Sequence, residues 1–462
     1  MKFEENMRIH FIAIGGSAMH NLALALADKG YTITGSDDEI FEPSRSRLAN
    51  KGLLPEKEGW FPEKLDNNID AVILGMHAKA DNPELLRAKE LKLKIYSYPE
   101  YLYEQSKDKT RIVIGGSHGK TTITAMVLHA FKQAGIISDY MIGAHLEGFE
   151  VMVKLSHNAH YMVIEGDEYL TSPIDPRPKF HLYHPHIALL SGIAWDHFNV
   201  FPSFEIYKKQ FEIFASSIVP HGTLVYCNED ETVRQIARNA PENITKVGYS
   251  MPESFLKDHK TYVKAADEWF SLQIFGKHNL LNLMGAMEVC KLVGIDNLTF
   301  MQTMTSFRGA SNRLELIAQN ESTAIYRDFA HSPSKVKATV EALYSQYQDR
   351  NLVACLELHT YSSLNKDFLP QYKGSLKMAQ KRVVYFNPHA LQLKNLPFLL
   401  PEEIKSSFED DSLQVFDDIN ELLAYLESLS WKNTNLLLMS SGNFDGLDLK
   451  RLADKILLTS AS

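Results

Sequence analysis

The segment Arg111–Thr122, which reads Arg-Ile-Val-Ile-Gly-Gly-Ser-His-Gly-Lys-Thr-Thr, constrains the fold of this chain more than any other part of its sequence. An apolar, β-rich run ends in paired glycines, and a helical pattern follows over Ile123–Gln133. Glycines let backbone N–H groups curl around phosphate oxygens, and a helix N-terminus adds partial positive charge. The order of strand, glycine-rich loop and helix therefore predicts an α/β domain that binds a nucleotide.

Seven residues of this loop are candidate nucleotide ligands: Gly116, Ser117, His118, Gly119, Lys120, Thr121 and Thr122. The Lys120 ammonium would reach the terminal phosphates, and the hydroxyl of Thr121 or Thr122 would contact Mg²⁺. The usual spacing G-x-x-x-x-G-K-[ST] places glycine where Ile114 stands, so this loop is shorter than the standard form. An ordinary glycine-rich turn with a chance lysine is the alternative, and the flanking strand and helix disfavour it.

Length and composition set the class of protein. A chain of 462 residues corresponds to about three domains of ordinary size. The net charge of −9 argues against a general nucleic-acid binder. The three cysteines have no metal-ligand or disulfide spacing, which favours the reducing cytoplasm. The charged start lacks the apolar core of a signal peptide, and no apolar run has the roughly 20 residues of a membrane helix, so we expect no membrane partner.

The first part of the chain reads as a Rossmann-like βαβ unit. Strands are predicted at Ile9–Ile14 and Tyr31–Gly35, with a helix over Asn21–Ala27 between them. The turn after the first strand lacks the G-x-G-x-x-G fingerprint, which makes a nicotinamide cofactor a weak interpretation. Further strands at Asp70–Gly75 and Lys94–Ser97 complete a small α/β unit, and the polar run Gln105–Thr110 reads as a linker.

Two more α/β segments follow. The predicted strands Tyr161–Ile164 and His186–Leu190 each run into polar residues at the carboxyl end, where ligands of open α/β sheets gather. A third segment begins near Leu316, with predicted strands at Thr323–Tyr326, Leu352–Leu356, Arg382–Phe386 and Asn435–Met439. We therefore expect an α/β fold of three domains, with boundaries at 1–107, 108–314 and 315–462.

Two candidate metal ligands follow strands of the central segment. Glu165 could hold Mg²⁺ beside the phosphates, because this ion prefers oxygen ligands. His197, next to Asp196, could ligate a metal as a neutral imidazole. The alternatives are a solvated acidic loop and a structural histidine, and each is favoured when the residue is considered alone.

Further candidates lie at a helix start and near the third segment. Asn279 and Asn282, beside His278, could pair with the donor and acceptor edge of adenine. Helix capping by Asn279 is the alternative, and it is favoured when this motif is considered alone. Arg313 could clamp a transferring phosphoryl group, and Asp328 could accept hydrogen bonds from ribose hydroxyls. Both could instead be ordinary surface charges.

The order of these motifs resembles the Mur ligase family over essentially the whole chain. The resemblance lies in Gly116–Thr122, Glu165–Tyr169, Asp196 with His197, Gly276–Asn279 with Asn282, Asn312–Glu315 and Asp328–Pro333. It implies a Rossmann-like UDP-binding domain, a central ATPase-type domain and a Rossmann-like C-terminal domain. The opening Ile14–Met19, together with His118, is similar to the branch of the family that extends UDP-N-acetylmuramate.

The resemblance also implies a role for each candidate residue. ATP would be bound by the loop residues 116–122 and by His278, Asn279, Asn282, Arg313, Asp328 and His331. Mg²⁺ would be held by Thr121, Glu165 and His197, and the catalytic residues would be Lys120, Glu165, His197 and Arg313. The UDP-sugar would contact Gly15, Gly16, Ser17, Ser36, Asp37 and His77.

The implied reaction forms an amide through an acyl phosphate. The segment Asp167–Tyr183, and Leu356-Glu357 before a polar loop, are similar to family members that add the tripeptide L-alanyl-γ-D-glutamyl-meso-diaminopimelate in murein recycling. The tripeptide is therefore the expected acceptor. The nearest alternative is free L-alanine, as in cell-wall synthesis. A P-loop kinase or switch NTPase and a non-catalytic UDP-sugar or nucleotide sensor are alternatives of other classes.

Overall fold

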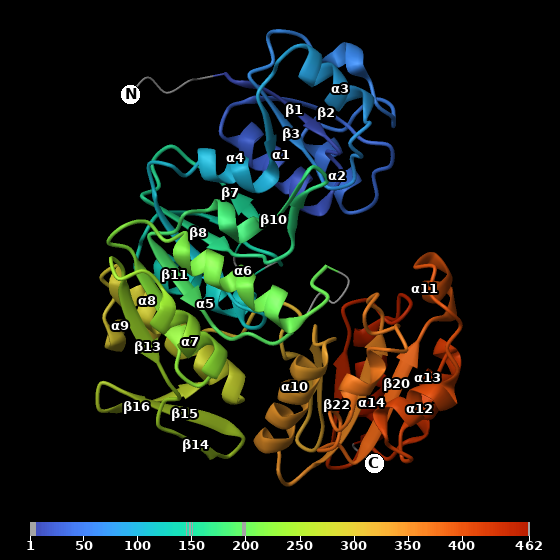
Figure 1. Cartoon of the computed structure of the whole chain (residues 1–462). Coiled ribbons are helices and arrows are strands. Elements are labelled where there is room, and N and C mark those ends of the chain that lie inside the picture. Colours follow the sequence, from blue (N-terminus) through green and yellow to red (C-terminus); the bar gives the residue numbers. More distant parts are fainter. Residues whose placement is uncertain (1–5, 145, 147–148, 150, 196–199, 461–462) are drawn as a thin grey trace. The chain divides into compact units, whose positions relative to one another are not determined.

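The computed structural model describes residues 6–144, 146, 149, 151–195 and 200–460 (Figure 1). The chain divides into two compact units, which are treated separately below. Unit 1 comprises Met1–Ile193 and Lys208–Gly248, and unit 2 comprises Ala194–Tyr207 and Tyr249–Ser462. Three sheets dominated by parallel strands confirm the predicted α/β fold, two of them in unit 1 and one in unit 2.

The first sheet of unit 1 has four parallel strands in the order β2-β1-β3-β4. Its elements are β1 (Arg8–Ile12), α1 (Ser17–Asp28), β2 (Thr32–Ser36), α2 (Ser44–Asn50), a 3-10 turn (Pro62–Lys64), β3 (Ala71–Leu74), α3 (Pro83–Glu90), β4 (Ile95–Ser97) and α4 (Tyr98–Glu104). Central parallel strands are covered on both faces, so β1 buries even its polar residue His10. The His10 ring is satisfied by Thr34 at 2.9 Å and by Glu84 at 3.2 Å.

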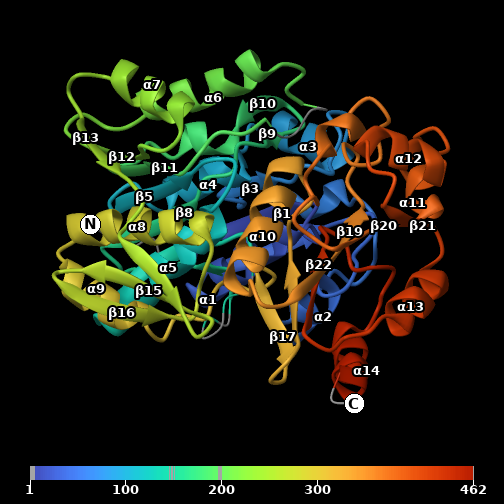
Figure 2. The ribbon, with the colours of Figure 1, turned by 90° about the horizontal axis from the view of Figure 1, so that it is seen from below.

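The second sheet of unit 1 places the glycine-rich loop at its centre. The strand order is β13-β12-β11-β5-β8-β6-β7, and β5 pairs in parallel with β11 and β8 (Figure 2). The loop after β5 therefore lies between the carboxyl ends of two neighbouring strands. Elements of this part are β5 (Thr110–Gly115), α5 (Lys120–Gln133), β6 (Ser138–Met141), β7 (Val153–Lys154), β8 (Tyr161–Glu165), the hairpin β9 (Leu170–Ser172) and β10 (Asp175–Pro178), a 3-10 turn (Lys179–Leu182), β11 (Ile187–Leu190), α6 (Phe204–Ser216), β12 (Thr223–Cys227), α7 (Glu231–Asn239) and β13 (Thr245–Tyr249).

The polar run Gln105–Thr110, predicted as a linker, connects α4 of the first sheet to β5 of the second. Ser106 and Lys109 are buried, and the Lys109 ammonium pairs with the buried Asp139 carboxylate at 2.5 Å. The connection is therefore a packed turn. Its packing was not predicted, because a pairing partner distant in the chain cannot be seen in the local sequence. The domain boundaries themselves stay a prediction.

Unit 2 contains a small antiparallel sheet and a larger mixed one. The small sheet, β14-β15-β16, was not predicted, and it lies beside α9. The larger sheet has the order β17-β18-β22-β19-β20-β21, with β17 alone antiparallel among its described strands. The elements are β14 (Ser254–Lys257), β15 (Lys260–Ala265), β16 (Glu268–Leu272), α8 (Lys277–Leu292), α9 (Asn297–Met304), β17 (Glu315–Gln319), β18 (Ala324–Asp328), α10 (Pro333–Gln346), β19 (Asn351–Leu358), a 3-10 turn (Leu369–Tyr372), β20 (Lys381–Phe386), α11 (Pro388–Leu393), α12 (Pro401–Phe408), β21 (Gln414–Phe416), α13 (Ile419–Ser428), β22 (Thr434–Met439) and α14 (Leu449–Ser460).

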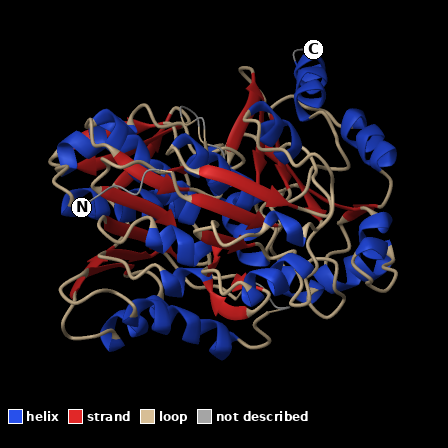
Figure 3. Cartoon of the chain, turned by 90° about the horizontal axis from the view of Figure 1, so that it is seen from above, coloured by secondary structure: helices blue, strands red, loops and turns tan. Residues whose placement is uncertain are grey.

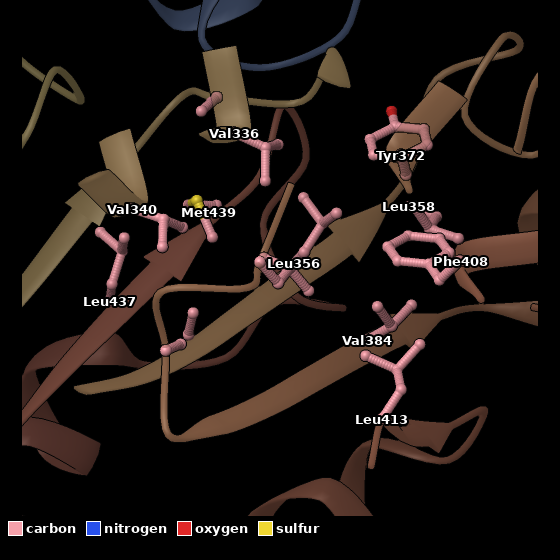
Figure 4. Close-up of a cluster of buried hydrophobic side chains, with 14 of the residues drawn as sticks. Val336, Val340, Leu356, Leu358, Tyr372, Val384, Phe408, Leu413, Leu437 and Met439 are labelled. Atoms are coloured by element: carbon pink, nitrogen blue, oxygen red, sulfur yellow. The ribbon is translucent and has the colours of Figure 1, made fainter. Parts of the chain in front are cut away.

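Strand β19 shows why the larger sheet forms. Its side chains alternate between two buried clusters, with Leu356 and Leu358 on one face and Val353 and Cys355 on the other. Figure 4 shows the first cluster, in which side chains of α10, β19, β20 and β22 meet. Burial on both faces explains the nearly continuous apolar sequence of this strand.

Helices flank the strands throughout the chain (Figure 3). Within the described ranges, none of these helices has both the length and the apolar sequence needed to cross a bilayer.

Candidate active site

The loop after β5 adopts a conformation that glycine makes possible. Gly116 has φ of +131° and Gly119 has φ of +78°, in the region that other residues disfavour. Helix α5 starts at Lys120, and no side chain caps it at Gly119. A helix N-terminus of this kind presents backbone N–H groups and the positive end of the helix dipole to an anion.

The neighbouring strand β11 braces the loop from one side. The Ser117 N–H donates to the Gly192 carbonyl at 2.8 Å, and the Ser191 hydroxyl donates to the His118 carbonyl. A Cβ atom on Gly116 would collide with the Ser191 hydroxyl. The loop is therefore held in shape by the polar residues that follow β11, and Gly116 admits no side chain.

The end of β8 supplies the carboxylate predicted to hold a metal. The Thr121 hydroxyl donates to one Glu165 oxygen at 2.8 Å, and the Gly143 N–H donates to the other at 2.8 Å. Glu165 is 9% exposed. A hydroxyl and a carboxylate at the start of α5 form an oxygen donor set that fits Mg²⁺, which takes few protein ligands and keeps several waters. Gly143 was not predicted.

Lys120 donates hydrogen bonds to two groups near the loop. Its ammonium donates to the Gly116 carbonyl at 2.6 Å and to the Glu168 carboxylate at 2.6 Å. Burial alone would lower the pKa of Lys120, but the negative charges of Glu168 and Asp167 outweigh it and raise that pKa. Lys120 therefore carries its charge at neutral pH. The sequence offered Glu168 only as a member of an acidic run, and its pairing with Lys120 was missed.

The first sheet forms a second glycine turn at its carboxyl edge. The Gly15 N–H donates to the buried Asp37 carboxylate at 2.6 Å, and a Cβ on Gly15 would lie 2.9 Å from that oxygen. Burial raises the pKa of Asp37 to about 6, with Asp38 adding to the shift and the Gly15 N–H opposing it. Ser17 is exposed as the first residue of α1, and His77 is exposed near Gly16.

One cation at this edge was not predicted. The Lys64 ammonium donates to the buried Ser36 hydroxyl at 3.2 Å and to the Gly35 carbonyl at 3.1 Å. It also lies 4.6 Å from the centre of the Phe61 ring. The structure thus gathers the predicted UDP-sugar residues at one edge, and it adds a lysine 28 positions from Ser36 in the chain.

The predicted adenine ligands lie at the start of α8 in unit 2. The Asn279 amide donates to the Phe275 carbonyl at 3.0 Å, and the Asn282 amide lies 3.4 Å from the Asn279 carbonyl oxygen. The N-cap residue of α8 is Gly276, so the alternative that Asn279 caps the helix is wrong. The Asn279 side chain instead bonds to the backbone of the preceding turn. Burial lowers the pKa of His278 to about 4, which keeps its imidazole neutral.

The remaining predicted nucleotide residues flank β17 and β18 in unit 2, since Arg313 precedes β17 and Asp328 is the last residue of β18. Asp328 accepts from the Leu314 N–H at 2.5 Å and from the Ala330 N–H at 2.7 Å. Burial raises the pKa of Asp328, and the charge of Arg313 opposes that rise. The Arg313 guanidinium lies 4.4 Å from the centre of the Phe329 ring. Asp328 therefore shapes the backbone around Arg313.

His331 and His197 complete the predicted set. The His331 ring bonds to the Phe329 carbonyl at 2.8 Å. His197 and Asp196 lie outside the described residues. Among the residues that are described, no three His, Cys, Asp or Glu side chains form a metal cluster. The structure brings Lys120, Thr121 and Glu165 together in unit 1, and the approach of Arg313 and His197 to them stays a prediction.

Comparison with known proteins matches the whole arrangement to one family. Residues 8–110 match the description "Mur ligase family, catalytic domain", residues 114–290 match "Mur ligase middle domain", and residues 312–442 match "Mur ligase, glutamate ligase domain". A UDP-N-acetylmuramate–L-alanine ligase of Sulfurihydrogenibium sp. is 30% identical over 372 residues, which cover 78% of each chain. This chain is a Mur ligase. It is accordingly an ATP-dependent enzyme of peptidoglycan biosynthesis that forms a carbon–nitrogen amide bond and releases ADP and phosphate.

Other relatives cover this Mur ligase almost completely. A UDP-N-acetylmuramate–L-alanine ligase of Carboxydothermus hydrogenoformans is 28% identical over 98% of this chain and 97% of its own. The solved UDP-N-acetylmuramate–alanine ligase of Thermotoga maritima has a TM-score of 0.70 at 20% identity, covering 98% of this chain and 100% of its own. The murein peptide ligase of Psychrobacter arcticus has a TM-score of 0.65 at 24% identity, covering 98% and 99%. The two structures support the three-domain fold.

These relatives overturn the expected tripeptide acceptor. The sequence relatives that span nearly the whole chain carry the name of L-alanine ligases, so the expectation of L-alanyl-γ-D-glutamyl-meso-diaminopimelate, and with it murein recycling, is wrong. The structure gives the physical reason why the motif misled. Asp167 pairs with Lys179 at 2.5 Å, and Phe180 packs in the core against Phe214 with ring centres 4.6 Å apart.

The second part of that motif is also explained locally. Glu357 is 2% exposed and accepts hydrogen bonds from the Phe444 N–H at 2.8 Å and from the Ser440 hydroxyl. Gly442 lies so close that a Cβ there would be 3.0 Å from the Glu357 carboxylate. Glu357 therefore ties two strand ends of unit 2 together, and its presence in the sequence does not identify an acceptor.

Proposed function

We propose that this Mur ligase joins the carboxylate of UDP-N-acetylmuramate to the α-amine of L-alanine at the expense of ATP. The observation that carries the chemistry is the arrangement after β5, where the charged Lys120 lies beside the Thr121–Glu165 pair. The names of the near full-length relatives support L-alanine as the acceptor.

Activation of the sugar carboxylate needs a good leaving group on its carbon, since a carboxylate does not form an amide spontaneously in water. Transfer of the γ-phosphoryl group gives an acyl phosphate, and attack by the α-amine then releases phosphate. Lys120 would neutralise charge on the transferring group, while the loop N–H groups hold the neighbouring phosphates. Arg313 would add a second cation at the same group, as the sequence predicts.

We assign the metal position to Thr121 and Glu165, with His197 as the predicted third ligand. Both oxygens of Glu165 are oriented by the protein, one by the Thr121 hydroxyl and one by the Gly143 N–H. Bound Mg²⁺ would supply charge neutralisation on the phosphates. The UDP portion would bind at the first sheet edge, with Gly15, Gly16 and Ser17 at the diphosphate and Ser36 or Asp37 at the uridine.

The test is ADP release by the full chain with ATP, Mg²⁺, UDP-N-acetylmuramate and one amine at a time. L-alanine should support turnover, and the tripeptide L-alanyl-γ-D-glutamyl-meso-diaminopimelate should support little. Faster turnover with the tripeptide would refute the proposed acceptor. ADP release that needs neither sugar nor amine would instead indicate an NTPase.

The cytoplasmic location suggested by the cysteines stays a prediction.

A further inference from the structure

Glu168 is a buried carboxylate that the proposed reaction does not use. Its side chain is 1% exposed and its Oε2 atom lies 2.6 Å from the Lys120 ammonium, whose side chain is 14% exposed. The same ammonium donates to the Gly116 carbonyl at 2.6 Å. The cation that should meet the terminal phosphates of ATP is therefore engaged by an anion and a loop carbonyl.

This contact opposes the binding of phosphate. A carboxylate close to an incoming phosphate repels it, and the repulsion is strong where little water screens the charges. If Lys120 leaves Glu168 to meet the phosphates, a buried carboxylate loses its cation, which also costs free energy. In both cases the Lys120–phosphate contact contributes less free energy to binding.

We propose that Glu168 is a positioning residue that acts through Lys120 and lowers the affinity of the loop for polyphosphate. It holds the ammonium beside the Gly116 carbonyl. A ligand that contacts only the loop binds weakly, whereas a complete nucleotide with further contacts still binds. The proposal rests on the loop being the ATP site, as proposed above.

The neighbouring Asp167 provides a matched control. Its carboxylate pairs with Lys179 at 2.5 Å rather than with Lys120, although it lies next to Glu168 in the chain. Glu168→Gln and Asp167→Asn each remove one negative charge from the same turn. Both carboxylates act on Lys120 through their charge, but only Glu168 contacts its ammonium. A general electrostatic effect would therefore appear in both variants, whereas an effect of the contact should appear in Glu168→Gln alone.

The experiment measures binding of tripolyphosphate and of ATP, each with Mg²⁺, to the full chain by isothermal titration calorimetry. Glu168→Gln should lower the Kd of tripolyphosphate about tenfold, the equivalent of one charge-assisted hydrogen bond. The KM for ATP should fall as well, while the KM for UDP-N-acetylmuramate stays unchanged. Asp167→Asn should change the Kd of tripolyphosphate less than about threefold, because its charge is paired with Lys179 and not with Lys120.

Two further variants test the route through Lys120. In a Lys120→Ala background, adding Glu168→Gln should leave the Kd of tripolyphosphate unchanged, and a persistent gain would overturn the proposed route. Glu168→Asp, which draws the carboxylate back by one methylene, should bind tripolyphosphate with an affinity between those of wild type and Glu168→Gln. That variant decides the matter if Glu168→Gln does not fold.

The remaining outcomes separate this inference from the proposed function. If wild type binds ATP but Glu168→Gln binds tripolyphosphate no more tightly, only the role of Glu168 is refuted. If wild type binds neither ATP nor tripolyphosphate, the loop is not the ATP site and the proposed function fails first.

Discussion

Two turns of unit 1 begin with the same four residues, Ile-Gly-Gly-Ser, but present different chemical groups. In the first turn, Ile14–Ser17, the helix α1 starts at Ser17 itself, which is exposed. After Ile114–Ser117 the chain adds His118 and Gly119 before α5 starts at Lys120, and Ser117 is buried. The longer connection provides room for a left-handed glycine and sets a lysine at the helix start.

The acids that serve these two turns also differ. In the first turn Asp37, from the end of β2, accepts a hydrogen bond from the backbone N–H of Gly15. In the second, Glu165 from the end of β8 accepts from the Thr121 hydroxyl. The first turn therefore has a carboxylate bound to its backbone, whereas the second combines a cation, a hydroxyl and a carboxylate, the groups used in phosphoryl transfer.

The largest expected difference between the turns lies in Lys120. Lys120→Ala should reduce ligation about 10³-fold, because a preorganised charge on the transferring phosphoryl group is lost. UDP-N-acetylmuramate should bind with unchanged Kd, since its proposed site is at the first turn. ADP release and calorimetry measure the two effects. Lys132→Ala, at the far end of α5, is the control and should remain active. Retained ligation in Lys120→Ala would contradict the role of the loop.

Substituting the second glycine of each turn by alanine should reduce the free energy of unfolding far more in the second turn than in the first. Gly116→Ala places a Cβ against the Ser191 hydroxyl at φ of +131°, so we expect a loss of about 3 kcal/mol in the free energy of unfolding. Gly16 has φ of −57°, and its nearest neighbour would lie 3.5 Å from a Cβ. Gly16→Ala should therefore cost less than about 1 kcal/mol. Denaturant unfolding of both variants checks this, and equal losses would show that the turns are not distinct.

Removal of the Glu165 charge should change the metal requirement. Glu165→Gln should raise the Mg²⁺ concentration for half-maximal ADP release about tenfold, because a neutral amide oxygen is a weaker ligand. The matched change at the first turn, Asp37→Asn, should leave the Mg²⁺ titration unaltered. An unchanged titration in Glu165→Gln would remove this residue from the metal site.

The last expected effect is a pH dependence of stability at Asp37. The pKa of Asp37 rises from 3.8 to about 6 on folding, so the folded chain keeps this proton where the unfolded chain loses it. Between those two pH values the wild type should lose stability relative to Asp37→Asn, and the difference should be constant at higher pH. Urea unfolding at pH 4, 5, 6 and 7 measures it. A difference that grows on acidification would have the wrong sign.

The predicted secondary structure was confirmed where the pattern was continuous and apolar. Strand β11 was predicted from His186 and starts at Ile187, and α5 was predicted over Ile123–Gln133 and spans Lys120–Gln133. The antiparallel strands β14, β15 and β16 were missed, because their short, largely exposed sequences carry no apolar run. The ion pair of Lys109 with Asp139 was not predicted, since it forms only in the folded chain.

The candidate site was predicted in part for the same reason. The sequence predicted Lys120, Thr121 and Glu165, because a glycine-rich loop and the end of an apolar strand can be recognised from local residues. The identity of their neighbours could not. Glu168 is 48 positions from Lys120, and Gly143 is 22 positions from Glu165, so only the fold brings them into contact.

The sequence by itself determined that the chain alternates strands and helices and that a phosphate-binding loop precedes α5. Those features depend on residues adjacent in the chain, whose conformational preferences act locally. Only the tertiary structure decided that Glu165 faces Thr121 and that Glu168 faces Lys120. The order β11-β5-β8-β6 sets which strand ends adjoin the loop, and strand order follows from packing across the whole sheet rather than from any one segment.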